Sequence, residues 1–589
     1  MRPTRSVSLL GLIALVGVLA LPSIPAGAVH GADTLVSVGS PPGPFAQNKQ
    51  NEPAVAVDPA HPNVLAAGSN DEIDLEACSA GDPTTCPFTA GIGTSGIYFS
   101  LDNGDSWVQP TYTGLTARDC LGPAACTTHA GPIGTIPLYY ENGLFSNGDP
   151  ALAFGPVPDS SGHFSWSNGS RLYYANLAGN LSTTHDESVF KGPFAVAVSR
   201  TDDVGAAAAG TNSAWMPPVI VTKQSSTTFS DKEQIGVDDA SSSPFFGHVY
   251  VCNASFRSSS KGNALPQPLI VGTSTDGGNT WTLKQVTPAS NNPFNTNQGF
   301  GRSGCTVRTD SNGVVYVLAT QFGAGLPGHG FHIMVKSFDG GKSWTKATKI
   351  FPVTDGCNAF DALNGRCVQD GIAGARNDLV NGPSISIANG APDGSGATNV
   401  IYDTWVDGGA GLNNEKVMVS YSTNGGATWS TPQDVTRPGD RGYYSAIALS
   451  PDGTDAYLVY NAFTTPYRDD TTSARGLVGV VLHSDIGSTG APTGWSEIHR
   501  GVVGDPRGSS QNGLISEFLG DYVYAAATRD YGVAVWNDVR NAADCPAIDA
   551  WRFSIRSGGS VARPSPNTDC PATFGNTDIF GGSFGDPTP

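Results

Sequence analysis

Short runs in which apolar residues alternate with small or polar ones recur along the whole chain, and Gly, Pro, Asn and Asp bound them. Apolar residues at helical spacing are nearly absent. A period of two is typical of β-strands that bury one face. The sequence therefore predicts an all-β protein.

Seven of these apolar runs open successive modules of similar layout. Each opener is followed by a turn, such as 451–453, and then by a second strand, such as 456–459. The modules are longer than the roughly 40 to 50 residues that a minimal repeat of four short strands needs, so the excess is expected in loops. The openers are residues 53–57, 151–154, 234–237, 305–308, 384–387, 445–449 and 524–527.

A hairpin signature follows the third strand in four modules, at residues 100–107, 274–281, 337–344 and 422–429. Three copies fit Ser-x-Asp-x-Gly-x-x-Trp, and the fourth has Asn in place of Asp. Gly supplies the positive φ of a tight turn, and the Asp or Asn side chain accepts bonds from the turn's own amides. The Trp covers the turn with apolar area.

This signature is the Asp box, and a chain with several copies resembles the sialidase-like β-propellers (Asp-box or BNR repeats). The resemblance implies a β-propeller of four-stranded blades, with the boxes as folding elements on the face opposite the ligand site. The openers give seven blades, whereas sialidases have six, which stays the alternative. The structural box residues are Ser100, Asp102, Gly104, Trp107, Ser274, Asp276, Gly278, Trp281, Ser337, Asp339, Gly341, Trp344, Ser422, Asn424, Gly426 and Trp429.

The first 28 residues have the layout of a secretory signal peptide. Arg2 and Arg5 precede an apolar run over 9–20, and small residues lead to a cleavage site after Ala28. We expect residues 29–589 to form a single propeller domain that is secreted. No later stretch approaches the roughly 20 apolar residues of a membrane span.

The cysteine content indicates the compartment of the protein, and the net charge excludes some classes of partner. The ten cysteines favour disulfides in an oxidising compartment, with neighbours paired as 78 with 86, 120 with 126, 357 with 367 and 545 with 570, which leaves 252 with 305. The formal net charge of −19 argues against nucleic acid or anionic membranes as partners. We expect a monomer.

In a propeller the innermost strands all begin at one face of the ring, here termed the upper face. The residues just before the openers should therefore surround the central funnel as a ring of carboxylates, phenols and an Arg, suited to a glycan or a cation. The alternative is that these polar residues only turn the chain into a strand. They include Asn51, Glu52, Asp149, Asp231, Lys232, Glu233, Arg302, Asn381, Tyr443, Tyr444, Asp521 and Tyr522.

Sialidase-like hydrolysis needs a Tyr nucleophile with a Glu partner, an acid/base Asp and Arg residues that grip the substrate carboxylate. The family's Arg-Ile-Pro motif is missing, and the first module has Asn-Glu-Pro at 51–53, so sialic acid itself is in doubt as substrate. By position, the candidates are Tyr443 or Tyr444 as nucleophile, Glu233 or Glu52 as its partner, Asp149 or Asp231 as proton donor, and Arg302, Arg540 and Asp521 as substrate contacts.

Two functions therefore compete. The first is a secreted, exo-acting, sialidase-like glycoside hydrolase of extracellular glycans. The second is a non-enzymatic propeller that binds polysaccharide or protein, and fold alone does not decide between them. Neither needs a cofactor. Calcium is a candidate ligand of the acidic loop with Asp71, Glu72 and Asp74, and the alternative is that such loops are simply solvated.

Overall fold

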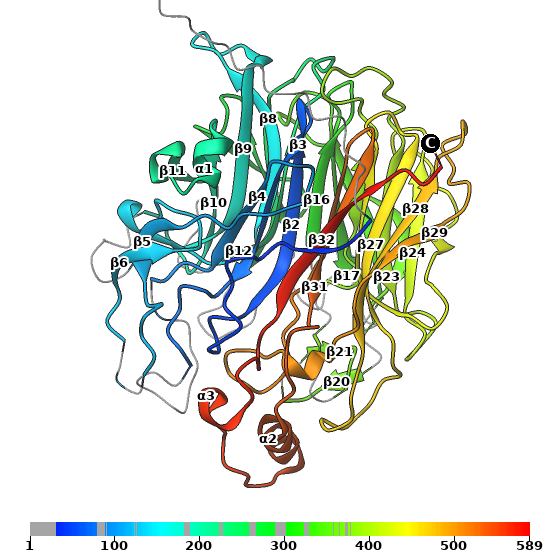
Figure 1. Ribbon diagram of the computed structural model, residues 1–589. Coiled ribbons are helices and arrows are strands. Elements are labelled where there is room, and N and C mark those ends of the chain that lie inside the picture. Colours follow the sequence, from blue (N-terminus) through cyan, green and yellow to red (C-terminus); the bar gives the residue numbers. More distant parts are fainter. Residues whose placement is uncertain are drawn as a thin grey trace, which may run out of the picture.

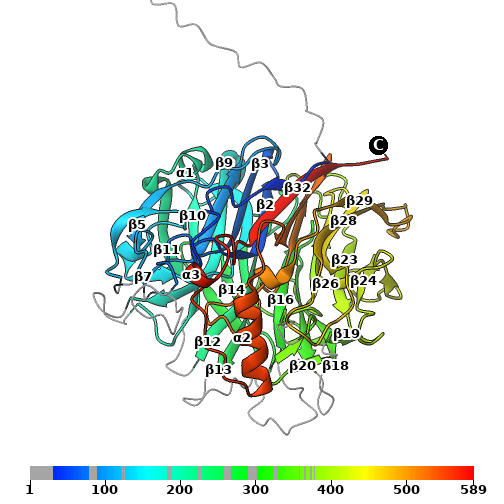
Figure 2. The same cartoon turned by 60° about the horizontal axis from the view of Figure 1, so that its bottom comes forward.

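The computed structural model shows seven antiparallel sheets arranged in a ring, which is a seven-bladed β-propeller (Figures 1 and 2). The innermost strands contact one another in the order β2, β8, β12, β16, β22, β26 and β30, and β30 returns to β2. The structure describes residues 31–588 apart from 79–88, 90, 123, 125, 182–188, 223–227, 258–266, 289–301, 323–328, 357–358, 364–365, 372–374 and 377–378.

The strands of the first four blades follow one another along the chain. Blade 1 is β2 (Gln50–Asp58), β3 (His61–Asp71) and β4 (Ser95–Ser100); blade 2 is β8 (Ala151–Pro158), β9 (Phe164–Asn180), β10 (Ala195–Thr201) and β11 (Trp215–Ile220); blade 3 is β12 (Thr228–Val237), β13 (Val249–Arg257), β14 (Leu269–Ser274) and β15 (Thr282–Gln285); blade 4 is β16 (Arg302–Thr309), β17 (Val315–Phe322), β18 (His329–Ser337) and β19 (Thr348–Thr354).

The last blade joins the two ends of the described chain. Blade 5 is β22 (Ser384–Ile387), β23 (Ile401–Asp407), β24 (Lys416–Ser422) and β25 (Gln433–Asp434). Blade 6 is β26 (Arg441–Leu449), β27 (Asp455–Phe463), β28 (Leu477–Asp485) and β29 (Ser496–Arg500). Blade 7, the last, is β30 (Tyr524–Ala527), β31 (Tyr531–Asp538), β32 (Asp578–Gly585) and β1 (Thr34–Leu35). Because β1 pairs with β32, the ring is closed by hydrogen bonds between its first and last strands.

Each of the seven predicted openers lies in the innermost strand of a blade, so the sequence-based count of seven is confirmed and the alternative of six is wrong. The inner strands bury small and branched residues, as in the pattern of β2, where eight of nine residues are buried. Apolar clusters fill the space between neighbouring sheets, and Trp405 and Trp536 are among their fully buried side chains.

The Asp boxes form the predicted hairpins at the ends of β4, β14, β18 and β24. In the first box, Ser100 Oγ accepts from the Gly104 amide at 2.8 Å, and Asp102 Oδ1 accepts from the Ser106 amide at 3.0 Å. Gly104 has φ +89°, and the Asn103 amide donates to the carbonyl of Asn63, near the start of β3 and just after β2 has ended. The boxes therefore lie on the face opposite the start of the inner strands, here termed the Asp-box face.

We expect Asp102→Ala to lower the free energy of unfolding by about 1–2 kcal/mol, because the Ser106 amide and hydroxyl lose their acceptor. Asp102→Asn should cost less, since Asn424 already makes the matching bond to the Thr428 amide at 2.9 Å. Urea unfolding measures both variants. Turnover should be unchanged, and its selective loss would contradict a purely structural role.

Three predicted disulfides are confirmed: Cys120–Cys126, Cys252–Cys305 and Cys545–Cys570. Cys78 and Cys367 are also disulfide-bonded, but their predicted partners lie outside the described residues, as does the expected signal peptide. In the described part of the chain, no helix is long and apolar enough to cross a membrane.

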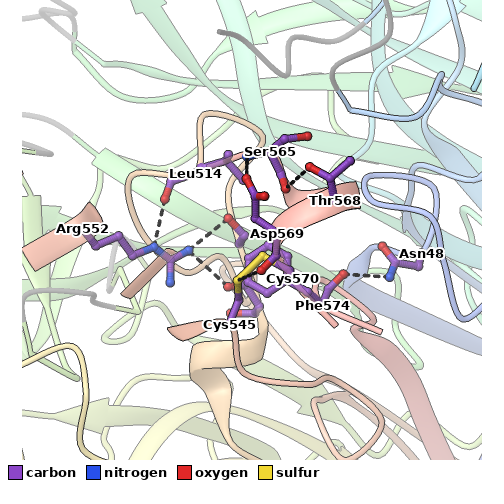
Figure 3. Close-up of a disulfide and its surroundings, with 11 residues drawn as sticks. Asn48, Leu514, Cys545, Arg552, Ser565, Thr568, Asp569, Cys570 and Phe574 are labelled. Carbon is purple, nitrogen blue, oxygen red and sulfur yellow. Dashed lines mark hydrogen bonds between the residues drawn. A yellow bond between two sulfur atoms is a disulfide. The ribbon is translucent and has the colours of Figure 1, made fainter. Parts of the chain in front are cut away.

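The upper face, which points to the bottom of Figure 1 and toward the viewer in Figure 2, carries the helices α2 (Pro546–Ser557) and α3 (Pro566–Asp569) and the hairpin of β20 (Ala359–Asp361) and β21 (Arg366–Val368). The Cys545–Cys570 disulfide links the start of α2 to the end of α3, and the fully buried Arg552 donates to the Leu514 carbonyl at 2.9 Å (Figure 3). Elsewhere, β7 (Leu144–Ser146) extends blade 2, β5 (Tyr112–Thr116) pairs with β6 (His129–Ile133), and α1 (Val204–Ala208) follows β10.

Candidate functional site

The inner strands begin with unusual backbone at the upper face. Four non-glycine residues there have left-handed φ angles: Glu52 at 58°, Asp149 at 54°, Lys232 at 58° and Tyr444 at 54°. Glu52, Lys232 and Tyr444 each lie in a β-bulge, where the register of the inner strand shifts. Such backbone costs free energy and redirects side chains, and it concentrates at functional sites.

The redirected side chains meet at the axis. Lys232 Nζ lies 2.7 Å from Asp521 Oδ2, 3.4 Å from Asp149 Oδ2 and 3.7 Å from Asp231 Oδ1. We term Glu52, Asp149, Asp231, Glu233 and Asp521 the carboxylate cluster. Its members come from blades 1, 2, 3 and 7, so only ring closure brings them together.

A second cation enters from the loop before β22. Arg376 makes a bidentate ion pair with Asp521, with Nε 2.9 Å from Oδ1 and Nη2 2.6 Å from Oδ2, and Nη2 lies 3.5 Å from Glu52 Oε1. Its guanidinium also stacks 4.4 Å from the ring of Phe518. Sequence reasoning missed Arg376 because it belongs to no motif and precedes no opener directly.

The environments separate the pKa values of these carboxyl groups. Burial, together with repulsion from Glu52, raises the pKa of Asp149 to about 7, and burial raises the pKa of Asp231 to about 6. Burial also disfavours ionised Asp521, but Arg376 and Lys232 outweigh it and hold its pKa well below the usual range. The Asp149 carboxyl is hydrogen-bonded to both Glu52 and Asp231. With a pKa of about 7, Asp149 is partly protonated at neutral pH and can share its proton with these neighbours.

Glu233 is buried without a hydrogen bond. Neither of its carboxyl oxygens has a partner in the part of the chain that the structure describes, and the residue is 4% exposed. Burial first, and then Asp149 and Asp231, raise its pKa well above the usual value. Burial and the neighbouring acids therefore favour the neutral form of the Glu233 carboxyl group.

The two tyrosines proposed as nucleophiles face the backbone of Arg376. The hydroxyls of Tyr443 and Tyr444 donate to the Arg376 carbonyl at 2.7 and 2.9 Å, and both residues are buried. Both bonds hold the backbone of Arg376, and the Tyr444 hydroxyl also lies 3.2 Å from Asp521 Oδ1 in the carboxylate cluster. A nucleophilic role for either tyrosine stays a prediction. Tyr522 is half-buried and lines the cavity beneath the cluster, and burial followed by Asp149 raises its pKa well above the usual value.

The two arginines proposed as substrate contacts belong to different parts of the ring. Arg302 begins β16 at the upper face. Arg540 is ion-paired with Asp33 at 2.5 Å and Asp538 at 2.7 Å, and it stacks 3.8 Å from the ring of Phe580. Arg540 thus lies against the outer strands of blade 7, apart from the cluster.

The acidic loop proposed for calcium is buried and paired. Asp74 binds Arg118 at 2.6 Å, and Glu72 binds Lys49 at 2.7 Å. Burial raises the pKa of Asp71 to about 6, and Tyr98 donates to this carboxyl. The alternative of a solvated loop is therefore wrong, because its acids are inside the protein. Calcium binding stays a prediction.

Two cavities occupy the axis. The smaller, of about 70 Å³, lies beneath Lys232 and Glu233, and the larger, of about 440 Å³, opens toward the Asp-box face. A hydrogen-bonded chain separates them, in which Arg308 donates to Tyr524 Oη at 3.0 Å and Tyr524 donates to Gln234 at 2.5 Å.

No protein-family model matches the sequence, and no curated protein matches it. Among solved structures, a Hadza microbial sialidase aligns with TM-score 0.37 and 12% identity over 77% of this chain and 72% of its own. The endosialidase of phage phi92 gives TM-score 0.38 and 10% identity over 95% and 70%. A protein of unknown function from Dyadobacter fermentans gives 0.35 and 11% over 75% and 99%. These low TM-scores carry no information on activity. The assignment of the fold as a propeller is based on the seven sheets and not on these alignments.

Proposed function

We propose that this chain is a secreted glycoside hydrolase that works at the carboxylate cluster, with Asp149 as proton donor. One arrangement carries the proposal: Lys232 Nζ lies 3.4 Å from Asp149 and 2.7 Å from Asp521. Burial raises the pKa of Asp149 to about 7, whereas Arg376 and Lys232 hold the pKa of Asp521 below its usual range. Two acids whose pKa values are driven apart can serve as acid and base in one reaction. In hydrolysis, Asp149 would protonate the leaving oxygen as its bond to the anomeric carbon breaks.

Asp231 suits the complementary role. It is the most exposed carboxylate around Lys232, with 24% of its side chain accessible against 12% for Asp149. Its pKa of about 6 leaves it ionised at neutral pH, so it can accept a proton from the water that adds to the anomeric carbon. Lys232 holds both groups in place.

The charge of the site favours sugars without a carboxylate. Both cations of the cluster, Lys232 and Arg376, are already ion-paired with it. Even with Asp149 and Glu233 neutral, the other acids of the cluster outnumber these two cations, so a substrate carboxylate would be repelled. Neutral or amino sugars of extracellular glycans are therefore the proposed substrates, in place of sialic acid.

A non-enzymatic propeller is the second candidate. Glu52 and Asp521 are 1% and 0% exposed, and the cavity of about 70 Å³ is small for a sugar. Both facts suit an ion cluster that joins blades 1, 2, 3 and 7, with glycan or protein binding elsewhere on the surface.

The test is turnover of fluorogenic glycosides by the protein purified from culture medium, with and without calcium. The panel contains neutral sugars, amino sugars and sialic acid. We expect release from neutral or amino glycosides and none from the sialoside. Release of sialic acid would contradict the proposed substrate class, and release from no glycoside would leave the non-enzymatic propeller.

A further inference from the structure

We propose that His483 and three aspartates on the Asp-box face bind one divalent transition-metal ion. Asp455 begins β27, His483 and Asp485 lie at the end of β28, and Asp586 follows β32. The group, here termed the blade 6–7 site, lies at the end of the ring opposite the carboxylate cluster. It is therefore independent of the proposed hydrolase.

The ligand atoms already converge. His483 Nε2 lies 3.0 Å from Asp455 Oδ1, 3.8 Å from Asp586 Oδ1 and 4.0 Å from Asp485 Oδ1. All four ligand atoms lie within 4.8 Å of one another. Ligands at about 2.0–2.2 Å from a shared ion are roughly 3–4.4 Å apart, so an ion fits with small movements.

The site has more negative charge than its own side chains neutralise. His483 is buried, with 2% of its side chain exposed, and it is the one basic group within 4 Å of these carboxylates among the described residues. By contrast, the buried Asp74 of the upper face is paired with Arg118. A divalent cation would supply the missing positive charge.

The donor set indicates the kind of metal. One imidazole nitrogen with carboxylate oxygens suits zinc, cobalt or manganese, whereas calcium prefers oxygen ligands alone. Thr588 adds a hydroxyl that donates to Asp485 at 2.5 Å and to Asp586 at 3.1 Å. Bound metal would fasten the end of β32 to blade 6, beside the strand pair that closes the ring.

The experiment titrates Zn²⁺ into the chelator-treated protein by calorimetry and records the melting temperature. We expect one Zn²⁺ per chain, a higher melting temperature and much weaker binding of Ca²⁺. His483→Gln and Asp485→Asn should each weaken Zn²⁺ at least about 10-fold. Asp485 is 44% exposed, so its replacement leaves folding intact.

Asp530→Asn is the matched control, because it removes an exposed carboxylate outside the ligand set from the start of β31. It should keep the affinity of the parent protein. Absence of Zn²⁺ binding would overturn the proposal, and so would binding that is unchanged in His483→Gln. Equal losses in Asp530→Asn and Asp485→Asn would also overturn it, since general electrostatic attraction would then explain the binding.

Discussion

Asp149→Asn is expected to lower kcat/KM on the best glycoside by about 10²- to 10⁴-fold, the usual contribution of general acid catalysis. The amide keeps the size of the carboxyl group but has no proton to transfer. In the parent protein, kcat/KM should fall as the pH rises through about 7, because Asp149 must be protonated to act. Steady-state kinetics between pH 4 and 9 measure both effects.

Asp159→Asn is the control for this variant. Asp159 lies in the turn between β8 and β9 of the same blade, exposed and at the other end of the strand. It should change neither the rate nor the pH profile. Full turnover by Asp149→Asn, or an unchanged alkaline limb in that variant, would remove Asp149 from the mechanism.

Lys232→Met should destabilise the fold by about 3–5 kcal/mol, the cost of removing one partner from a buried ion cluster. Lys232 contacts Asp149, Asp231 and Asp521 from three blades, and only 11% of its side chain is exposed. Without it, these acids repel one another in a buried environment. Urea unfolding at neutral pH measures the loss.

The surface pair of Lys416 and Asp434 provides the comparison. It is 3.3 Å long, and its side chains are 37% and 43% exposed. Solvent screens such a pair, so Lys416→Met should cost less than about 1 kcal/mol. Similar small losses in both variants would show that the cluster contributes little to the closure of the ring.

Local chemistry explains why the blades could be read from the sequence. The turns at Gly104 and Gly278 depend only on residues a few positions away, and the inner strands span only four to ten residues. Both patterns are local, so distant segments of the sequence do not alter them. The seven openers therefore gave the correct blade count despite loops of very different length.

Part of the candidate site followed from the same logic. Glu52, Asp149, Asp231 and Asp521 were expected near one another because all inner strands start at the upper face, and the structure places each of them around Lys232 or Arg376. Arg540 was expected near them for another reason, because the loops after the second strands return to the upper face, but its side chain turns outward to Asp33.

The sequence by itself determined the all-β class, the seven modules, the Asp-box hairpins and three disulfides, because each depends on short-range patterns or spacing. Only the tertiary structure decided that Arg376 joins the cluster, that Tyr443 and Tyr444 bind its backbone and that burial raises the pKa of Asp149 to about 7. Those properties depend on burial and on charges from blades distant in sequence. Closure of the ring sets the distances between the side chains of the carboxylate cluster.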